Sequence, residues 1–395
     1  MSSCDRVGEA ASLNALMVAR CFEPAVAYGG PVVKMSEMAR FLAGRGHGVT
    51  AVVSDLLSAS ERTGRRSEEE PSPGVALLRL RGYGRYRWET FVPHVAGELG
   101  ALQPRPDIVH IYGFRHQLGW VASRWATACG LPFVLEPEGS FEPSSRSLAK
   151  KAVFDRLVGK RQVAGAVRVV AESEREGAEF CAHGVLAEKV VVLRNGADAT
   201  GARTFPKAEA RSRLGLPRDI PLVVWLGRLI RQKDTPLLIR AVARLDGVGL
   251  VLAGPDEDGS AEGCRTLAGE LGMGSRLWLP GVMDDETKWA LFAAADCFAL
   301  SSLKESFGIA AAEAMMAGVP VVVPDTAGVA GAVTPELGSV VPRDAGALAA
   351  AVGEHLGRRV GRDNRLLDTD RLRSLSWEER GDKLLAMYEE IVRGG

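Results

Sequence analysis

Two glutamates flank the start of one predicted helix, where their side chains could bind the two ends of one ligand. An alanine-rich run predicts the helix at 307–317, because alanine is a strong helix former and Gly318 with Pro320 ends it. Glu305 precedes this helix. Glu313 lies about six residues into it, roughly 9 Å along the axis. A diphosphate fills about that gap.

Backbone amides at the same helix start provide a place for the diphosphate. The N–H groups of Phe307, Gly308 and Ile309 would attract an anion, and Gly308 lets it approach the backbone closely. Glu313 could then accept both hydroxyls of a ribose, and Glu305 the hydroxyls of a sugar at the other end. Both glutamates could instead be solvated surface charges, but Glu313 lies in an Ala/Met run where a solvated face would be more polar. One ligand satisfies all three features, a nucleoside diphosphate sugar.

The stretch Glu-Ser-Phe-Gly-Ile-Ala-Ala-Ala-Glu-Ala-Met-Met-Ala-Gly-Val-Pro-Val-Val at 305–322 resembles the signature of the retaining glycosyltransferases of family 4, which have the two-domain GT-B fold. Two glutamates alone would be a weak match. The Phe-Gly pair between them and the trailing Ala-Gly-Val-Pro make the match specific. The resemblance implies that the donor is bound by Glu305, Ser306, Phe307, Gly308, Ile309 and Glu313.

Two cations follow a predicted strand at 221–226 and precede a helix that Asp234 or Thr235 is expected to cap. Arg228 and Lys233 suit a diphosphate, which carries about two negative charges. Surface cations are common, so their spacing alone leaves a site and a solvated loop equally open. The run Gly-Arg-Leu-Ile-Arg-Gln-Lys-Asp resembles the family's Gly-Arg-Leu-x-x-x-Lys-Gly element, which implies phosphate binding.

Three further loops have counterparts in the family. Gly29 and Gly30 connect a predicted strand to a helix; the resemblance implies that their amides face the donor phosphate and the acceptor, although a plain tight turn would also explain them. Val282 follows a strand end where the family's backbone receives the nucleobase. Glu138 with Gly139 stands where many members have a His-Gly pair whose histidine contacts the donor sugar. Glu138 therefore either binds a hydroxyl or amine of donor or acceptor, or caps the segment that follows.

Apolar runs that alternate with helical patterns predict an α/β protein. We expect the GT-B fold, with two Rossmann-like, doubly wound domains facing an interdomain cleft. The acceptor-binding domain is expected at 1–200 and the nucleotide-sugar-binding domain at 214–375, while a terminal helix at 376–393 packs back on the first domain. The predicted strands lie at 13–19, 49–53, 75–80, 107–111, 133–136, 167–171, 190–193, 221–226, 249–253, 276–280, 297–300, 319–323 and 338–341.

Composition favours an ordinary globular enzyme of the cytoplasm. The formal net charge is zero, which gives no general attraction to nucleic acid. The six cysteines have no paired or metal-like spacing, and neither a signal peptide nor an apolar run of membrane-spanning length is found. Segment 61–70 is expected to be a solvated loop, and 81–88 a surface or acceptor-facing loop. The basic amphipathic helix at 141–161 is expected to pack on its domain, with weak contact to the inner membrane face as the alternative.

The predicted reaction is transfer of a sugar from a UDP- or GDP-linked donor to a hydroxyl, with retention and without a metal or other cofactor. Arg228, Lys233 and the helix start would stabilise the charge that develops on the β-phosphate. The resemblance implies a front-face route, on which Glu305 positions the sugar and is not a nucleophile. The acceptor stays open: a saccharide, a lipid-linked sugar or a small metabolite. The alternatives are a nucleotide-sugar epimerase, another GT-B enzyme, or a non-catalytic nucleotide-sugar-binding subunit.

Overall fold

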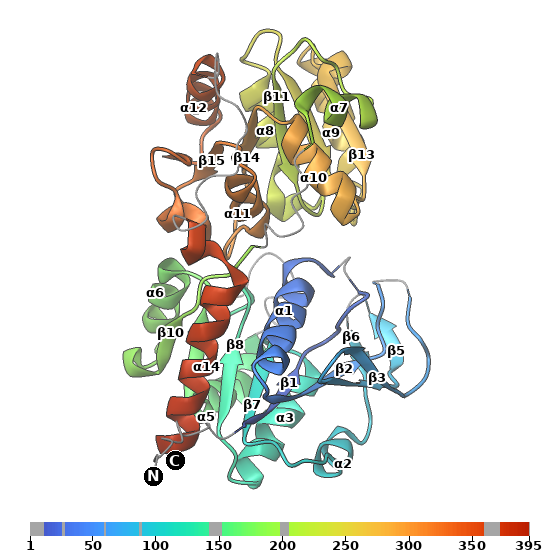
Figure 1. Cartoon of the computed structure of the whole chain (residues 1–395), viewed down its shortest axis with the longest axis vertical. Coiled ribbons are helices and arrows are strands. Elements are labelled where there is room, and N and C mark those ends of the chain that lie inside the picture. The colour runs from blue at the N-terminus through green and yellow to red at the C-terminus, as the bar shows by residue number, and fades with distance from the viewer. Residues whose placement is uncertain are drawn as a thin grey trace, which may run out of the picture. The chain divides into compact units, whose positions relative to one another are not determined.

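The chain forms two compact units, each built on its own sheet (Figure 1). The computed structural model describes residues 12–25, 28–58, 61–86, 89–141, 152–197, 205–358 and 372–394. The first unit takes its described residues from 1–171, 180–191 and 381–395. The second unit takes its described residues from 172–179 and 192–380.

The sheet of the first unit has the strand order β10-β9-β8-β7-β1-β2-β4-β3. Neighbouring strands from β9 to β4 pair in parallel, and β3 at the edge pairs antiparallel with β4. The inner strands read as apolar runs because both of their faces are buried. The strands are β1 (Asn14–Val18), β2 (Gly48–Ser54), β3 (Ser67–Ser72), β4 (Val75–Leu80), β7 (Ile108–Tyr112), β8 (Phe133–Glu136), β9 (Arg168–Ala171) and β10 (Val190–Val192).

Helices cover both faces of this first sheet. A right-handed crossover fixes the face, so α1 after β1 and α3 after β7 lie on opposite sides. Phe41 of α1 packs on Gly381 of α14, which places α14 beside α1. The helices are α1 (Gly30–Gly44), α2 (Val95–Gly100), α3 (Gln117–Ala128), α5 (Lys160–Gly165), α6 (Glu174–Ala182) and α14 (Trp377–Gly394). Two of these helices are divided between the units: residues 180–182 of α6 and residues from Gly381 onward in α14 belong to the first unit, whereas 174–179 and 377–380 belong to the second.

The sheet of the second unit is parallel throughout, in the order β13-β12-β11-β14-β15-β16. By the same crossover rule α8 and α9 cover one face, and α10 and α11 the other. Trp225 of β11 is fully buried in the core. The strands are β11 (Leu222–Leu226), β12 (Gly249–Ala253), β13 (Leu277–Gly281), β14 (Cys297–Ala299), β15 (Val321–Pro324) and β16 (Gly338–Val341). The helices are α7 (Lys207–Arg213), α8 (Thr235–Val242), α9 (Ser260–Glu270), α10 (Asp285–Ala294), α11 (Ile309–Met316) and α12 (Ala345–Gly357).

Two predicted loops are wrong because they contain edge strands. Segment 61–70 runs into β3, where Glu69 forms a 3.1 Å ion pair with Arg79 of β4. Segment 81–88 contributes β5 (Tyr83–Tyr86), which pairs antiparallel with β6 (Glu89–Phe91). Residues 87–88 lie outside the described residues. In both places the polar or basic composition indicated a loop, although the backbone pairs with a neighbouring strand.

The helix between the two glutamates is shorter than predicted. It begins at Ile309 because Gly308 has φ +109°, which no α-helical residue adopts. Glu313 is therefore the fifth residue of α11, about 6 Å along the axis from Ile309 instead of 9 Å. The distance from Glu313 to the helix start is therefore shorter than the one predicted to hold a diphosphate.

Candidate active site

The predicted phosphate and sugar residues gather at one edge of the second sheet. Strand order reverses between β11 and β14, which are neighbours although β12 and β13 lie between them in the chain. Ligands in parallel α/β sheets bind at the carboxyl ends of strands at such a reversal. Arg228 and Lys233 follow β11, and Glu305 follows β14, so the topology brings their loops together.

Lys233 and Glu305 form an ion pair in this region. Nζ of Lys233 lies 2.9 Å from Oε1 and 2.7 Å from Oε2 of Glu305, and the hydroxyl of Ser302 donates to Oε2 at 2.8 Å. Only 20% and 11% of the Lys233 and Glu305 side chains are exposed. The ammonium thus neutralises the carboxylate and fixes its orientation. A phosphate that used Lys233 would have to share it with Glu305.

The turn after Glu305 is fixed by contact with the segment after β15. The amide of Gly328 donates to the carbonyl of Glu305 at 3.0 Å, and the amide of Val329 to that of Phe307 at 2.7 Å. A Cβ on Gly328 would lie 1.8 Å from the carbonyl oxygen of Ser306. Only glycine permits this approach, so the shape of the turn depends on it.

The predicted anion-binding amides lie at the end of that turn. Phe307 has its side chain buried, while Gly308 and Ile309 lead into α11. Within the described residues no backbone carbonyl accepts from the amides of Phe307, Gly308 or Ile309. The three N–H groups therefore keep their capacity to bind an anion.

Glu313 of α11 is held by a lysine that the sequence analysis missed. Nζ of Lys288 on α10 lies 2.8 Å from Oε1 of Glu313, with 20% and 13% of the two side chains exposed. Burial alone would lower the pKa of Lys288, but the charge and hydrogen bond of Glu313, with smaller contributions from Asp285, raise it. Lys288 is thus a charged partner of the predicted ribose-binding carboxylate. No local sequence signal links the two helices.

The other residues predicted in the second unit are more exposed. Nη1 of Arg228 lies 3.3 Å from Oε2 of Glu257, a loose pair with 32% and 23% of the side chains exposed. Val282 follows β13 and is 72% exposed. Of the two predicted caps, Asp234 occupies the N-cap position of α8, but its carboxylate pairs with Arg343 and forms no cap hydrogen bond.

In the first unit, Gly29 and Gly30 begin α1 after β1, where that sheet also reverses its strand order. Gly29 has φ +91°. Beside this turn, Nε of Arg20 pairs with Glu89 at 2.7 Å, and its Nη1 donates to the Tyr28 hydroxyl at 2.8 Å. Burial, as the largest cause, raises the pKa of Tyr28. The glycine pair therefore lies next to a largely neutralised polar cluster.

Glu138 and Gly139 follow β8, and both adopt left-handed backbone, with φ +55° and +70°. For a glutamate this conformation costs on the order of 1 kcal/mol. Nζ of the fully buried Lys34 lies 2.9 Å from Glu138 Oε1 and 2.5 Å from Glu136 Oε1. The Glu138 carboxylate is thereby anchored to the interior of its own unit.

Glu136 also connects to the terminal helix. Nε2 of His110 lies 3.3 Å from Glu136 Oε2, and its Nδ1 lies 2.6 Å from the hydroxyl of Tyr388 in α14. Trp377 and Tyr388 are both buried. A chain of buried polar groups therefore runs from α14 to the carboxyl end of β8.

The predicted basic helix at 141–161 is described only in part, since 142–151 lie outside the described residues. Phe154 packs against Phe114, with ring centroids 6.1 Å apart. Val153 and Leu157 are 58% and 63% exposed, so packing covers only part of the apolar side. In the described chain no helix combines the length and apolar character that crossing a bilayer requires.

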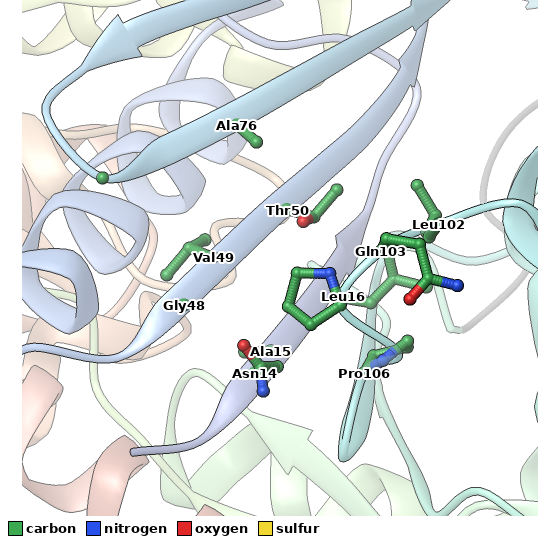
Figure 2. Close-up of a pocket in the computed structure, with 12 residues that line it drawn as sticks. Asn14, Ala15, Leu16, Gly48, Val49, Thr50, Ala76, Leu102, Gln103 and Pro106 are labelled. Atoms are coloured by element: carbon green, nitrogen blue, oxygen red, sulfur yellow. The ribbon is translucent and has the colours of Figure 1, made fainter.

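A cavity of ≈ 200 Å³ opens at the opposite edge of the first sheet (Figure 2). Asn14, Gly48 and Gly74 line it at the amino ends of β1, β2 and β4, together with Gln103. No predicted site residue lines it. It is therefore separate from the region at the carboxyl ends of the strands.

Two family descriptions match the chain in succession. Residues 29–196 match the glycosyl transferase 4-like domain, and residues 206–364 match the glycosyl transferases group 1. Arg228, Lys233, Glu305 and Glu313 fall in the second match. Gly29 is the first residue of the first match.

Among curated proteins, the chain is similar to the D-inositol 3-phosphate glycosyltransferases of Mycobacterium tuberculosis (strain ATCC 25618 / H37Rv) and Mycobacterium bovis (strain BCG / Pasteur 1173P2). Each is 32% identical over 301 residues, which are 72% of this chain and 62% of the relative. The match thus spans 62% of the length of these relatives.

Solved structures share the architecture. Sucrose-phosphate synthase from Thermosynechococcus elongatus superposes with a TM-score of 0.73 at 21% identity, covering 97% of this chain and 100% of the other. Anabaena HepE in complex with UDP superposes with a TM-score of 0.73 at 19% identity, covering 95% of this chain and 99% of the other. Its complex with UDP-glucose superposes with a TM-score of 0.65 at 18% identity, covering 97% of this chain and 98% of the other. At these identities the likeness shows the fold alone. It confirms the predicted GT-B fold with two Rossmann-like domains.

Proposed function

Because the chain carries a glycosyl transferase 4-like domain followed by a group 1 glycosyl transferase domain, we propose that it transfers a sugar from a nucleoside diphosphate sugar to a hydroxyl acceptor. The observation that carries the proposal is the turn from Glu305 to α11. There a carboxylate, three amide donors and a second carboxylate follow one another along the edge of the sheet.

The donor is assigned to the second unit. The diphosphate lies against the amides of Phe307, Gly308 and Ile309, and Arg228 and Lys233 balance its charge. Glu313 accepts the ribose hydroxyls, Val282 lies beside the base, and the amide and side chain of Ser306 face the phosphates. A UDP- or GDP-linked sugar meets these requirements, and the neighbour solved with UDP and with UDP-glucose supports the uridine form.

Transfer is proposed to retain the anomeric configuration by a front-face route. The acceptor hydroxyl attacks the anomeric carbon on the face of the leaving phosphate, the bond from that carbon to the phosphate oxygen breaks, and the departing phosphate takes the hydroxyl proton. The two cations and the amides stabilise the charge on that phosphate, with no metal required. Lys233 and Ser302 hold both oxygens of Glu305, which supports a role in positioning the sugar over one as a nucleophile.

The acceptor is assigned to the first unit, near Gly29, Gly30, Glu138 and Gly139. The mycobacterial relatives are named for an inositol phosphate, so a small polyol is the first acceptor class to test. Because Val153 and Leu157 are exposed, we also propose weak contact of segment 141–161 with the inner membrane face. A cytoplasmic location is part of the same proposal.

The proposal is tested by binding and turnover. UDP-, GDP- and dTDP-sugars are screened for thermal stabilisation, and the donors that bind are incubated with polyol acceptors while nucleoside diphosphate release and the product's anomeric configuration are measured. Glu313→Ala and Arg228→Ala should each weaken nucleotide binding roughly 10- to 100-fold, as expected for lost hydrogen bonds to charged groups.

Three results would count against the proposal. Conversion of the donor sugar without any acceptor would indicate an epimerase, and binding without turnover would indicate a non-catalytic subunit. A fully active Arg228→Ala/Glu313→Ala double variant would remove the site assignment. As a matched control, Arg213→Ala changes an arginine of α7 in the same unit that pairs with Glu286, and it should leave binding unchanged.

A further inference from the structure

The contact between Lys288 and Glu313 joins two helices of the second unit. Lys288 is the fourth residue of α10, and Glu313 is the fifth of α11. Their charged atoms are 2.8 Å apart, and four-fifths or more of each side chain is buried. The Lys288 ammonium also lies 5.2 Å from the centre of the Trp289 ring. The lysine is therefore held on several sides.

Lys288 acts on only one side of the carboxylate. An ionised carboxylate offers about four acceptor positions on two oxygens, and Lys288 donates to Oε1. A glutamate has three side-chain torsions, so without a partner it samples several rotamers. Fixing one oxygen selects one orientation of the carboxylate. The entropy cost of ordering the Glu313 side chain then falls on folding and does not reduce the affinity for the ligand.

Resting on the proposed function, we propose that Lys288 is a positioning residue that orients Glu313 to accept both hydroxyls of the donor's ribose. It is assigned no contact with the reacting atoms. The pair thereby selects ribose over deoxyribose, because a ligand that lacks a hydroxyl leaves an acceptor of the oriented, mostly buried carboxylate unmatched.

Two other accounts of the same contact make different predictions. If the pair only joins α10 to α11, removing Lys288 lowers the stability of the protein but weakens the binding of UDP and of 2′-deoxy-UDP equally. If Lys288 instead competes with the ribose for Glu313, removing it strengthens UDP binding. Only a positioning role makes the preference for ribose depend on the lysine.

The experiment compares UDP with 2′-deoxy-UDP by calorimetric titration of the full chain. Wild type should prefer UDP by about tenfold or more, and Lys288→Met should reduce the preference to roughly threefold or less while weakening UDP itself about tenfold. Lys288→Arg keeps the cation and should restore most of the preference. Lys207→Met is the matched control, since Lys207 pairs with Asp296 elsewhere in the same unit, and it should keep the wild-type preference.

The outcomes separate the inference from the proposed function. If wild type binds neither nucleotide nor their GDP counterparts, the proposed function fails. If wild type prefers UDP and Lys288→Met keeps that preference or binds UDP more tightly, the positioning role is wrong while the proposed function stands. Should Lys288→Met unfold, Lys288→Ala, which also removes the donor, is titrated in its place under the same criteria.

Discussion

Glu305→Gln is expected to strengthen binding of UDP while lowering sugar transfer. In the structure Lys233 is shared by both oxygens of Glu305, at 2.9 and 2.7 Å. A phosphate that needs this ammonium must draw it away from the carboxylate. A glutamine of similar shape removes the competing charge, so Lys233 becomes available to the phosphate.

The magnitude follows from how deeply the pair is buried. Exposed ion pairs contribute about 0–1 kcal/mol, and breaking a fully buried one costs roughly 3–5 kcal/mol. With 20% and 11% of the Lys233 and Glu305 side chains exposed, we expect about 1.5 kcal/mol, which corresponds to roughly tenfold tighter UDP binding. Transfer from UDP-glucose should fall about 100-fold or more, because the sugar loses its charged acceptor.

Calorimetric titration with UDP and a nucleoside diphosphate release assay measure the two effects. The Glu305→Gln/Lys233→Met double variant is the control, since without the lysine the gain in UDP affinity should disappear. Unchanged or weaker UDP binding by Glu305→Gln would show that the phosphate does not use Lys233, and would refute the assignment of that cation.

Three further predictions concern the framework. Gly328→Ala places a Cβ 1.8 Å from the Ser306 carbonyl oxygen, so urea unfolding should show a loss of about 1–3 kcal/mol, accompanied by weaker UDP binding. Burial, then the charge of Arg20, lowers the pKa of His116 from 6.5 to about 3. The unfolded chain therefore binds a proton below about pH 6.5 that the folded chain does not. As pH falls from 6.5 toward 3, this should lower the unfolding free energy by up to about 1.4 kcal/mol per pH unit. In His116→Gln this contribution to the pH dependence of the unfolding free energy should be absent. Tyr388→Phe removes the 2.6 Å contact with His110 and should lower the unfolding free energy by about 1–2 kcal/mol, measured at pH 7.

Much of the fold could be predicted from the sequence because its strands are short apolar runs bounded by glycine, proline or polar residues. The predicted ranges of β4, β8, β12 and β16 match the structure residue for residue. The edge strands could not be predicted in this way. β3 consists largely of glutamate, serine and proline, and its strand conformation comes from pairing with β4.

The start of α11 shows a different limit. Alanine propensity and the following Gly318 locate the helix, but the first residue depends on Gly308, whose backbone is set by the contact of the turn with Gly328. Glycine permits many conformations, so its presence at 308 did not reveal which one the fold selects. The error moved the helix start by two residues and shortened the predicted reach to Glu313.

The pairing of the charged groups in the site is the part that no single motif contains. Lys233 meets Glu305 across 72 residues of sequence, Lys288 meets Glu313 across 25, and Lys34 meets Glu136 across 102. In each case the carboxylate lies at or after the carboxyl end of a strand or on the adjacent helix, where burial would leave it unpaired without a cation from another element. The stretch 305–322 supplies Glu305 and Glu313, but the topology determines which lysines reach them. An enzyme that kept the stretch 305–322 but lost Lys233 and Lys288 would therefore retain both glutamates while they lost their charge balance and their orientation.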